Sequence, residues 1–138
     1  MIDQIITDVN ILHQISKPVT MEQILELNLR DRLEAANMLA WTLGAGLAAI
    51  QIGIPLQFGW YRIDGNEFIL VNPVILGRRG KHTTKEGCLS IPHKWIEVER
   101  AWEIEYKNGE KIQHAKGFKA RLIQHEIDHM NGRLITDE

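Results

Sequence analysis

The residues best suited to chemistry lie near the end of the sequence, where His125 and His129 flank Glu126 in a His-Glu-x-x-His pattern. If this stretch is helical, the two histidines lie one turn apart on one face and can direct imidazole nitrogens at the same cation. A glutamate beside them can move protons for a metal-bound water. Catalytic sites of this kind usually use three protein ligands, so the pattern calls for a third ligand elsewhere.

The third ligand is expected upstream, since the sequence ends soon after His129, at Glu138. Cys88 is one candidate, because a thiolate is a soft, negatively charged ligand. It could also be an inert buried thiol, or a nucleophile beside a histidine, although a Cys-His pair gives no reason for a second histidine one turn away. The remaining candidates are the other histidines, at positions 13, 82, 93 and 114.

The histidine pair shares a helical stripe with Phe118 and Leu122, and Asn131-Gly132 is a typical helix end. Two imidazoles on such a stripe would need polar partners, since an unpaired buried polar group costs about 1–3 kcal/mol. A shared cation would remove that cost. The stripe therefore favours a metal site over a chance match to the pattern.

A glycine-rich segment, Gly-Ala-Gly-Leu-Ala-Ala-Ile-Gln at 44–51, is a second candidate for chemistry. It matches the loose Gly-x-Gly-x-x-Gly/Ala dinucleotide fingerprint, but that fingerprint needs a strand before it and a helix after it, whereas here a helix is predicted before it. Small residues can instead bring backbone close to a ligand, with Gln51 as a neutral amide donor to an oxyanion. The alternative is a tightly packed turn with a surface glutamine.

Length and composition indicate one domain over 1–138. Hydrophobic residues make up 44% and charged residues 25%, which is ordinary for a globular protein, and no apolar run reaches the ~18 residues of a membrane helix. A formal net charge of -2 gives no broad basic field for nucleic-acid binding. The N-terminus lacks the pattern of a secretory signal, so a cytoplasmic location is expected.

The remaining elements follow from periodicity. A capping box at Thr20 and apolar residues at three- and four-residue steps predict one helix over about 21–43, preceded by an irregular arm over 7–19. Charged residues on the opposite face of that helix are expected to be solvated. Two pairs of strands are predicted, at 58–63 with 67–71, and at 102–106 with 111–114 around an Asn-Gly turn, with Trp102, Ile104 and Tyr106 on a buried face.

Three motifs, the glycine-rich segment at 44–51, Glu-Gly-Cys-Leu-Ser at 86–90 and Gln-His-Glu-x-Asp-His at 124–129, resemble in this order those of peptide deformylase. The resemblance covers essentially the whole chain. It implies an α+β fold, with small antiparallel or mixed sheets packed around a central metal-binding helix and one long helix near the N-terminus. The metal ligands it implies are Cys88, His125 and His129, binding Fe²⁺ as the usual physiological ion and Zn²⁺ or Ni²⁺ as substitutes.

The implied reaction removes the formyl group from the N-terminal formyl-methionine of nascent chains. By the resemblance, Glu126 is the general acid and base, while Gln51 and the backbone N–H of Leu89 stabilise the oxyanion. A thiolate ligand weakens the metal as a Lewis acid, which places more of the stabilisation on these two donors. The residues expected beside the substrate are Ala45, Gly46, Glu86 and Gly87.

Asp128 is expected either to pair with a cation such as Arg100 around a metal ligand or to be a solvated helix carboxylate. Trp95 departs from the family, in which many members carry a basic residue at this position.

The sequence also lacks the C-terminal helix with which many bacterial members can dock on the ribosome. A transient ribosome contact and a monomer are expected. Two rivals stay open, a metalloprotease and a catalytically idle metal-binding module that recognises nascent chains.

Overall fold

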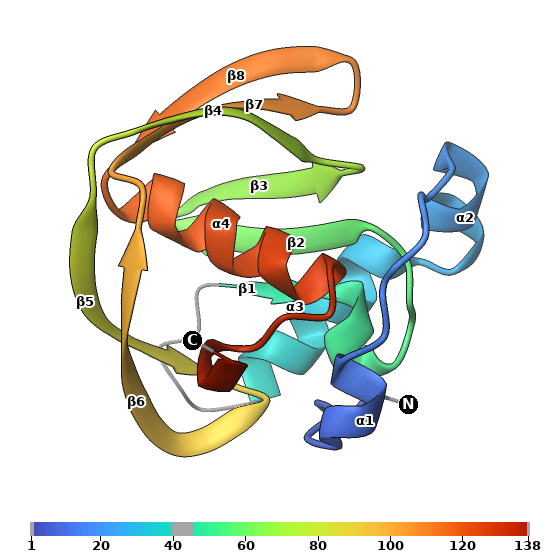
Figure 1. Ribbon diagram of the computed structural model, residues 1–138. Coiled ribbons are helices and arrows are strands. Elements are labelled where there is room, and N and C mark those ends of the chain that lie inside the picture. The colour runs from blue at the N-terminus through green and yellow to red at the C-terminus, as the bar shows by residue number, and fades with distance from the viewer. Residues whose placement is uncertain (1, 40–45, 138) are drawn as a thin grey trace.

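The structure, a computed structural model, describes residues 2–39 and 46–137 (Figure 1). The described helices are α1 (Val9–Leu12), α2 (Met21–Glu26), α3 (Leu29–Leu39), α4 (Phe118–Met130) and two short 3₁₀ helices, η1 (Ala49–Ile52) and η2 (Ile135–Asp137). The described strands are β1 (Gly46–Ala48), β2 (Phe58–Ile63), β3 (Asn66–Val71), β4 (Val74–Arg79), β5 (His82–Cys88), β6 (Ile91–Arg100), β7 (Glu103–Asn108) and β8 (Lys111–Lys116).

Within the described residues, the strands form three small antiparallel sheets with orders β1-β2-β3, β4-β7-β8 and β5-β6. Helix α4 contacts β1, β2, β8 and η1. Figure 1 shows it running between the sheets, with the β5–β6 ribbon crossing near its N-terminal half. The fold is thus α+β, as expected from the sequence. None of the described helices is long and apolar enough to cross a membrane.

Helix α4 contains the predicted stripe and ends as the Asn-Gly pair indicates. Gly132 adopts a left-handed conformation with φ of 74°. Its N–H donates to the carbonyl of His129 (3.1 Å), and the N–H of Arg133 donates to the carbonyl of Asp128 (2.8 Å). These two bonds make a Schellman motif, which satisfies carbonyls that the helix end would otherwise leave unpaired.

The single long helix predicted over 21–43 is wrong, because the chain breaks it between α2 and α3. Asn28 takes a left-handed backbone with φ of 51° and ends the first helix. The predicted capping box at Thr20 is confirmed, with Thr20 and Gln23 bonding each other's backbone. The last predicted residues of the helix, 40–43, and its glycine stop at 44–45 lie outside the described residues.

The charged residues of this helical region, which were expected to contact only solvent, also form ion pairs. Arg30 in α3 bonds Glu34 (3.0 Å) and Glu67, and Arg62 from β2 also bonds Glu34 (2.7 Å). These exposed pairs tie α3 to the β2–β3 hairpin, although exposed ion pairs contribute little stability each. The 7–19 arm is irregular as predicted, apart from the single turn of α1.

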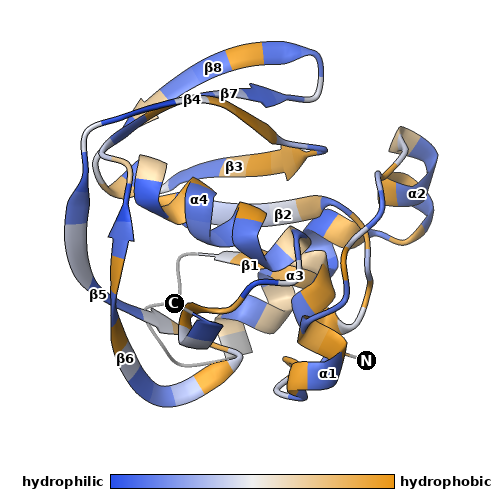
Figure 2. Ribbon diagram, viewed as in Figure 1, coloured by the Kyte–Doolittle hydropathy of each residue, from blue (hydrophilic) through white to orange (hydrophobic). Residues whose placement is uncertain are grey.

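Both predicted strand pairs are present, as β2–β3 and β7–β8. In the second pair Ile104 and Tyr106 are buried as expected, but Trp102 precedes the strand and is 47% exposed. The β5–β6 ribbon was not predicted, because β5 has no apolar alternation. In Figure 2 this strand is mostly hydrophilic.

Two apolar clusters hold the described parts together. The first joins α3, β1, η1 and β2 around Leu33, Leu47 and Phe58. The second packs α4 through Ile123 and Ile127 against β2, β3, β7 and β8. One face of α4 is thereby fixed by burial of apolar side chains, the main favourable term in folding.

We predict that Gly132→Ala destabilises the protein by more than Gly65→Ala. Both glycines have positive φ, which costs an alanine about 1–2 kcal/mol. A Cβ on Gly132 would also lie 2.5 Å from the carbonyl oxygen of His13, whereas one on Gly65 would meet nothing within 4 Å. The clash should add about 1–3 kcal/mol. Equal free energies of unfolding by urea denaturation would contradict this account.

Candidate metal centre

Three side chains from two distant segments converge beside α4. His125 and His129 lie one turn apart on this helix, and Cys88 ends β5. The Nε2 atoms of the two histidines are 3.1 Å apart, and the Sγ of Cys88 is 3.3 Å from the Nε2 of His129. All three ligand atoms lie within 4.8 Å of one another. The cysteine, among the candidates left open by the sequence, is the one brought to the histidine pair.

These distances suit a tetrahedral ion. With metal–nitrogen bonds of ~2.0–2.1 Å and metal–sulfur bonds of ~2.3 Å, ligand atoms in a tetrahedral site lie roughly 3.3–3.6 Å apart. The observed separations of 3.1 and 3.3 Å require little adjustment. A set of one thiolate and two imidazoles suits Zn²⁺ and Fe²⁺ better than Ca²⁺ or Mg²⁺.

The other histidines lie elsewhere. His13 pairs with Asp137 (3.3 Å) and His114 with Glu105 (2.9 Å). His82 packs edge-on against the ring of Trp102. None of these belongs to the ligand cluster found among the described residues.

Glu86 orients the first of the two helical histidines. Its Oε1 lies 3.0 Å from the Nδ1 of His125. A carboxylate can only accept, so Nδ1 carries the proton and Nε2 keeps its lone pair for a metal. A carboxylate behind a metal-binding histidine commonly fixes the tautomer in this way.

The Glu86 carboxylate is itself held by two arginines. Arg100 donates from Nε (2.8 Å) and Nη2 (2.9 Å), and Arg121 donates from Nη1. Burial alone would raise the pKa of the Glu86 carboxyl, but hydrogen bonds from Arg100 and His125 outweigh it and hold this pKa well below its usual range. The sequence predicts that Glu86 lies beside the substrate; its side chain is buried and engaged with these partners.

Asp128 pairs with Arg100, as one of the two sequence hypotheses had it. The Oδ2 of Asp128 accepts from Nη1 of Arg100 at 2.6 Å. Arg100 therefore joins two carboxylates, one on β5 and one on α4. Among the described residues, hydrogen bonds connect the carboxylate of Asp128 to His125 through Arg100 and Glu86.

Gln51 lies in η1 and is almost completely buried, so the surface-glutamine alternative is wrong. Its Oε1 accepts from the backbone N–H of Ala48 (3.0 Å), which leaves the amide nitrogen to face the metal ligands. That nitrogen lies 3.1 Å from the Oγ of Ser90 and 3.7 Å from the Sγ of Cys88. The amide is thus fixed from both ends, with its donor side at the candidate site.

Glu126 is 1% exposed, and its Oε2 has no hydrogen-bond partner among the described residues. Burial raises the pKa of its carboxyl to about 7, against smaller opposing effects of His125 and Arg100. An orphaned carboxylate oxygen beside three converging ligands is costly unless it has a task or an unseen partner. A carboxyl with a pKa near 7 can exchange a proton near neutral pH.

Of the remaining predicted residues, Leu89 and Gly87 are the chain neighbours of Cys88. Leu89 follows it in the turn between β5 and β6. Gly87 precedes it, and a Cβ there would lie 3.0 Å from the indole of Trp95, which is 68% exposed. Gly46 is in β1, where a Cβ would overlap the Cβ of Tyr61 at 2.2 Å. Ala45 lies outside the described residues.

Sequence reasoning missed the parts played by Ser90 and Arg121. Arg121 precedes His125 by one turn, so it lies on the core-facing stripe of α4. An arginine at such a position indicates a buried carboxylate partner. Ser90 gave no comparable sign, because its partner is 39 residues away in sequence.

Comparisons with known proteins agree with this arrangement. The family profile of polypeptide deformylase matches residues 2–138. A peptide deformylase of Elusimicrobium minutum is 36% identical, over 93% of this chain and 81% of its own length. The crystal structure of the Thermotoga maritima peptide deformylase superposes with a TM-score of 0.88 at 31% identity, covering 100% of this chain and 97% of that one.

A probable peptide deformylase from Synechococcus phage S-SSM7 superposes with a TM-score of 0.83 at 32% identity, covering 98% of each chain. The matched lengths include β5 with Cys88 and α4 with its two histidines. From the profile, the sequence relatives and the solved structures, the chain belongs to the peptide deformylase family and is an enzyme, a hydrolase of formylated peptides.

Proposed function

We propose that Cys88, His125 and His129 together bind one divalent metal ion, with Fe²⁺ as the physiological ion and Zn²⁺ or Ni²⁺ as substitutes. The observation that carries this proposal is the convergence of one thiol and two imidazole nitrogens within 4.8 Å. The proton of His125 is directed to Glu86, so its lone pair is free for the ion. When bound, the ion would supply Lewis-acid chemistry and lower the pKa of water.

The substrate is the N-terminal formyl-methionine of a nascent polypeptide, and the products are formate and a free amino terminus. Glu126 takes a proton from the attacking water and delivers it to the departing amine. Gln51 Nε2 and the backbone N–H of Leu89 stabilise the oxyanion. The buried bond from the N–H of Ala48 supports this role of Gln51, because it fixes the orientation of the amide before substrate binds.

Gly46, Ala45 and Gly87 are proposed to border the substrate, since they flank Gln51 and Cys88 in sequence. For Glu86 the backbone alone takes that role, because its carboxylate holds His125 and the arginines.

We also propose that residues 1–138 form one catalytic domain around α4, the metal-binding helix. It would act as a monomer in the cytoplasm, in transient contact with the ribosome where formylated chains emerge.

An idle metal-binding module is disfavoured by Glu126, whose buried and unpartnered oxygen has no purpose in a purely structural site. A metalloprotease uses the same pattern but needs room for an internal peptide bond. Anaerobic purification with Fe²⁺ or Ni²⁺, followed by assays on a formyl-Met dipeptide and on an internal peptide, separates the three. Formate release without internal cleavage is expected; a fully metal-loaded protein that releases no formate would falsify the proposal.

Removing a ligand should abolish metal retention. His125→Ala is expected to weaken metal binding by more than the ~10–100-fold typical of removing a residue that only supports a ligand, because the ion would keep two protein ligands. His114→Ala, which removes an exposed histidine paired with Glu105, is the matched control. Metal content after dialysis and thermal melting with added Zn²⁺ measure the effect. Equal metal content in the two variants would rule out His125 as a ligand.

Glu126→Gln should lower kcat by about 10²–10⁴ while metal stays bound, because the amide has nearly the same shape but cannot take up the proton. Glu110→Gln, in the exposed turn between β7 and β8, changes the charge equally and should leave kcat unaltered. Formate release and metal content are measured on the same samples. A kcat near that of the unsubstituted protein in Glu126→Gln would remove Glu126 from the proton transfers.

Gln51→Ala should lower kcat by roughly 10²–10³ with metal retained, as expected for loss of one oxyanion donor. Ser90→Ala should lower kcat by less, because the amide keeps its bond from Ala48 and loses only the bond to the serine hydroxyl. Gln14→Ala, which removes an exposed glutamine, is the control. If Gln51→Ala loses metal as well as activity, the residue holds the site together rather than stabilising the oxyanion.

A further inference from the structure

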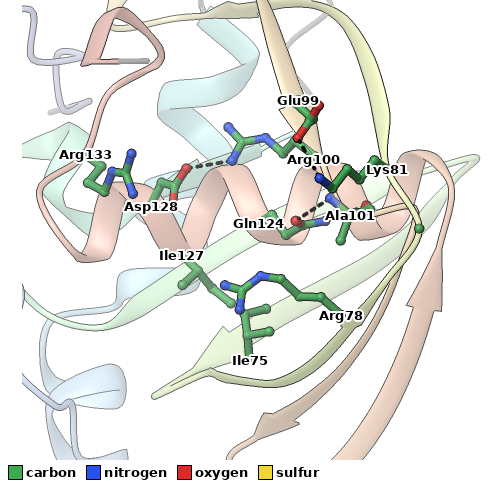
Figure 3. Close-up of a pocket in the computed structure, with 11 residues that line it drawn as sticks. Ile75, Arg78, Lys81, Glu99, Arg100, Ala101, Gln124, Ile127, Asp128 and Arg133 are labelled. Carbon is green, nitrogen blue, oxygen red and sulfur yellow. Dashed lines mark hydrogen bonds and ion pairs between the residues drawn. The ribbon is translucent and has the colours of Figure 1, made fainter.

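A cavity of about 500 Å³ lies on the side of α4 that carries Gln124, Ile127 and Asp128 (Figure 3). Its walls come from β4, the segment around Gly80, the end of β6 and the turn after α4. A volume of this size is within the range of small-molecule sites. The metal ligands and Gln51 are not among its lining residues.

The charges around the cavity are unbalanced. Four cationic side chains line it together with two carboxylates, although the chain as a whole has a formal net charge of -2. The cations are Arg78, Lys81, Arg100 and Arg133; the carboxylates are Glu99 and Asp128. Concave surfaces of one sign focus the electrostatic field and concentrate counterions.

The two carboxylates do not cancel the excess. Asp128 lies 2.6 Å from Nη1 of Arg100, so its charge is balanced by a buried guanidinium. Glu99 lies 3.9 Å from the ammonium of Lys81, and both side chains are more than half exposed, which makes this a weak pair. The cavity therefore keeps a net positive charge, to which Arg78 and Lys81 both contribute.

Arg78 is the strongest candidate for a ligand-binding group. Within residues 2–39 and 46–137 it forms no ion pair. Figure 3 shows its side chain extending beneath α4 toward Ile127, with Ile75 beside it. Arg78 is exposed, and its guanidinium presents a planar fork of donors that matches two oxygens of a phosphate group.

We propose that this cavity is an anion-binding site for phosphate groups, with Arg78 and Lys81 as principal donors. Phosphate oxygens could come from free phosphate or from the phosphodiester backbone of RNA, and both offer the same acceptors. Arg100 contributes charge but is already bonded to Glu86 and Asp128, so it is a supporting cation.

Two double variants test the site in the metal-loaded protein. Arg78→Gln/Lys81→Gln removes the proposed donors, and Arg79→Gln/Lys85→Gln removes the same charge from exposed neighbours that do not line the cavity. Inorganic phosphate and single-stranded hexauridylate are titrated separately by calorimetry. We expect the first variant to weaken binding by about tenfold or more, as for removal of charge-assisted bonds, and the control by less than about twofold.

The probes distinguish the source of the phosphate. Binding of inorganic phosphate with this pattern points to free phosphate. Binding of hexauridylate alone points to a polymer. The negative slope of log K against log salt should then become shallower by roughly 1.4 in the first variant, because each of the two phosphate charges that are no longer neutralised accounts for ~0.7 of that slope. Equal weakening in the two double variants, or no binding of either probe, would overturn the proposal. Unchanged binding in both double variants, which is the result expected if phosphate bound only at the metal, would overturn it as well.

Discussion

The buried carboxylate of Glu86 is the constraint on which the rest of the site depends. It accepts hydrogen bonds from Arg100 and Arg121 and from the imidazole of His125. A carboxylate taken out of water is stable only if such partners replace its hydration, and removing one partner of a buried pair costs about 3–5 kcal/mol. The same bonds that make this charge tolerable also set the tautomer of His125, the proposed metal ligand. The stability of the fold and the geometry of the proposed metal site therefore both depend on the side chain of Glu86.

The sequence predicted the site better than the fold. Helix α4 and its end at Gly132 follow from local patterns, because ligand chemistry restricts residue types at short spacing. The same patterns left the third ligand open between Cys88 and four other histidines, and only the resemblance to peptide deformylase indicated the cysteine that lies beside the histidine pair. The break at Asn28 could not be predicted in this way. The apolar period continues through this position, and the left-handed backbone of an asparagine does not alter that period. Propensity and periodicity were overridden there by packing.

The side-chain partners of Glu86 were not predicted, for a related reason. Its position beside Gly87 and Cys88 suggested the substrate, and no local pattern indicates that an arginine 14 residues later and another 35 residues later would surround it. Ion pairs across such separations depend on how β5, β6 and α4 meet. The β5–β6 ribbon could not itself be predicted from the hydrophobic pattern, because a strand with solvent on both faces shows no alternation of apolar and polar residues.

That ribbon carries Cys88 with little apolar surface of its own to fix it. A two-stranded ribbon is marginally stable in isolation, and only Val98 in its length is a buried apolar residue. Its attachment to α4 is instead polar: Glu86 on β5 and Arg100 on β6 bond His125, Arg121 and Asp128 on the helix. Directional bonds fix position more narrowly than apolar contact, which tolerates sliding. The thiol can thus be held within 3.3 Å of His129 even though the strand that carries it is exposed along most of its length.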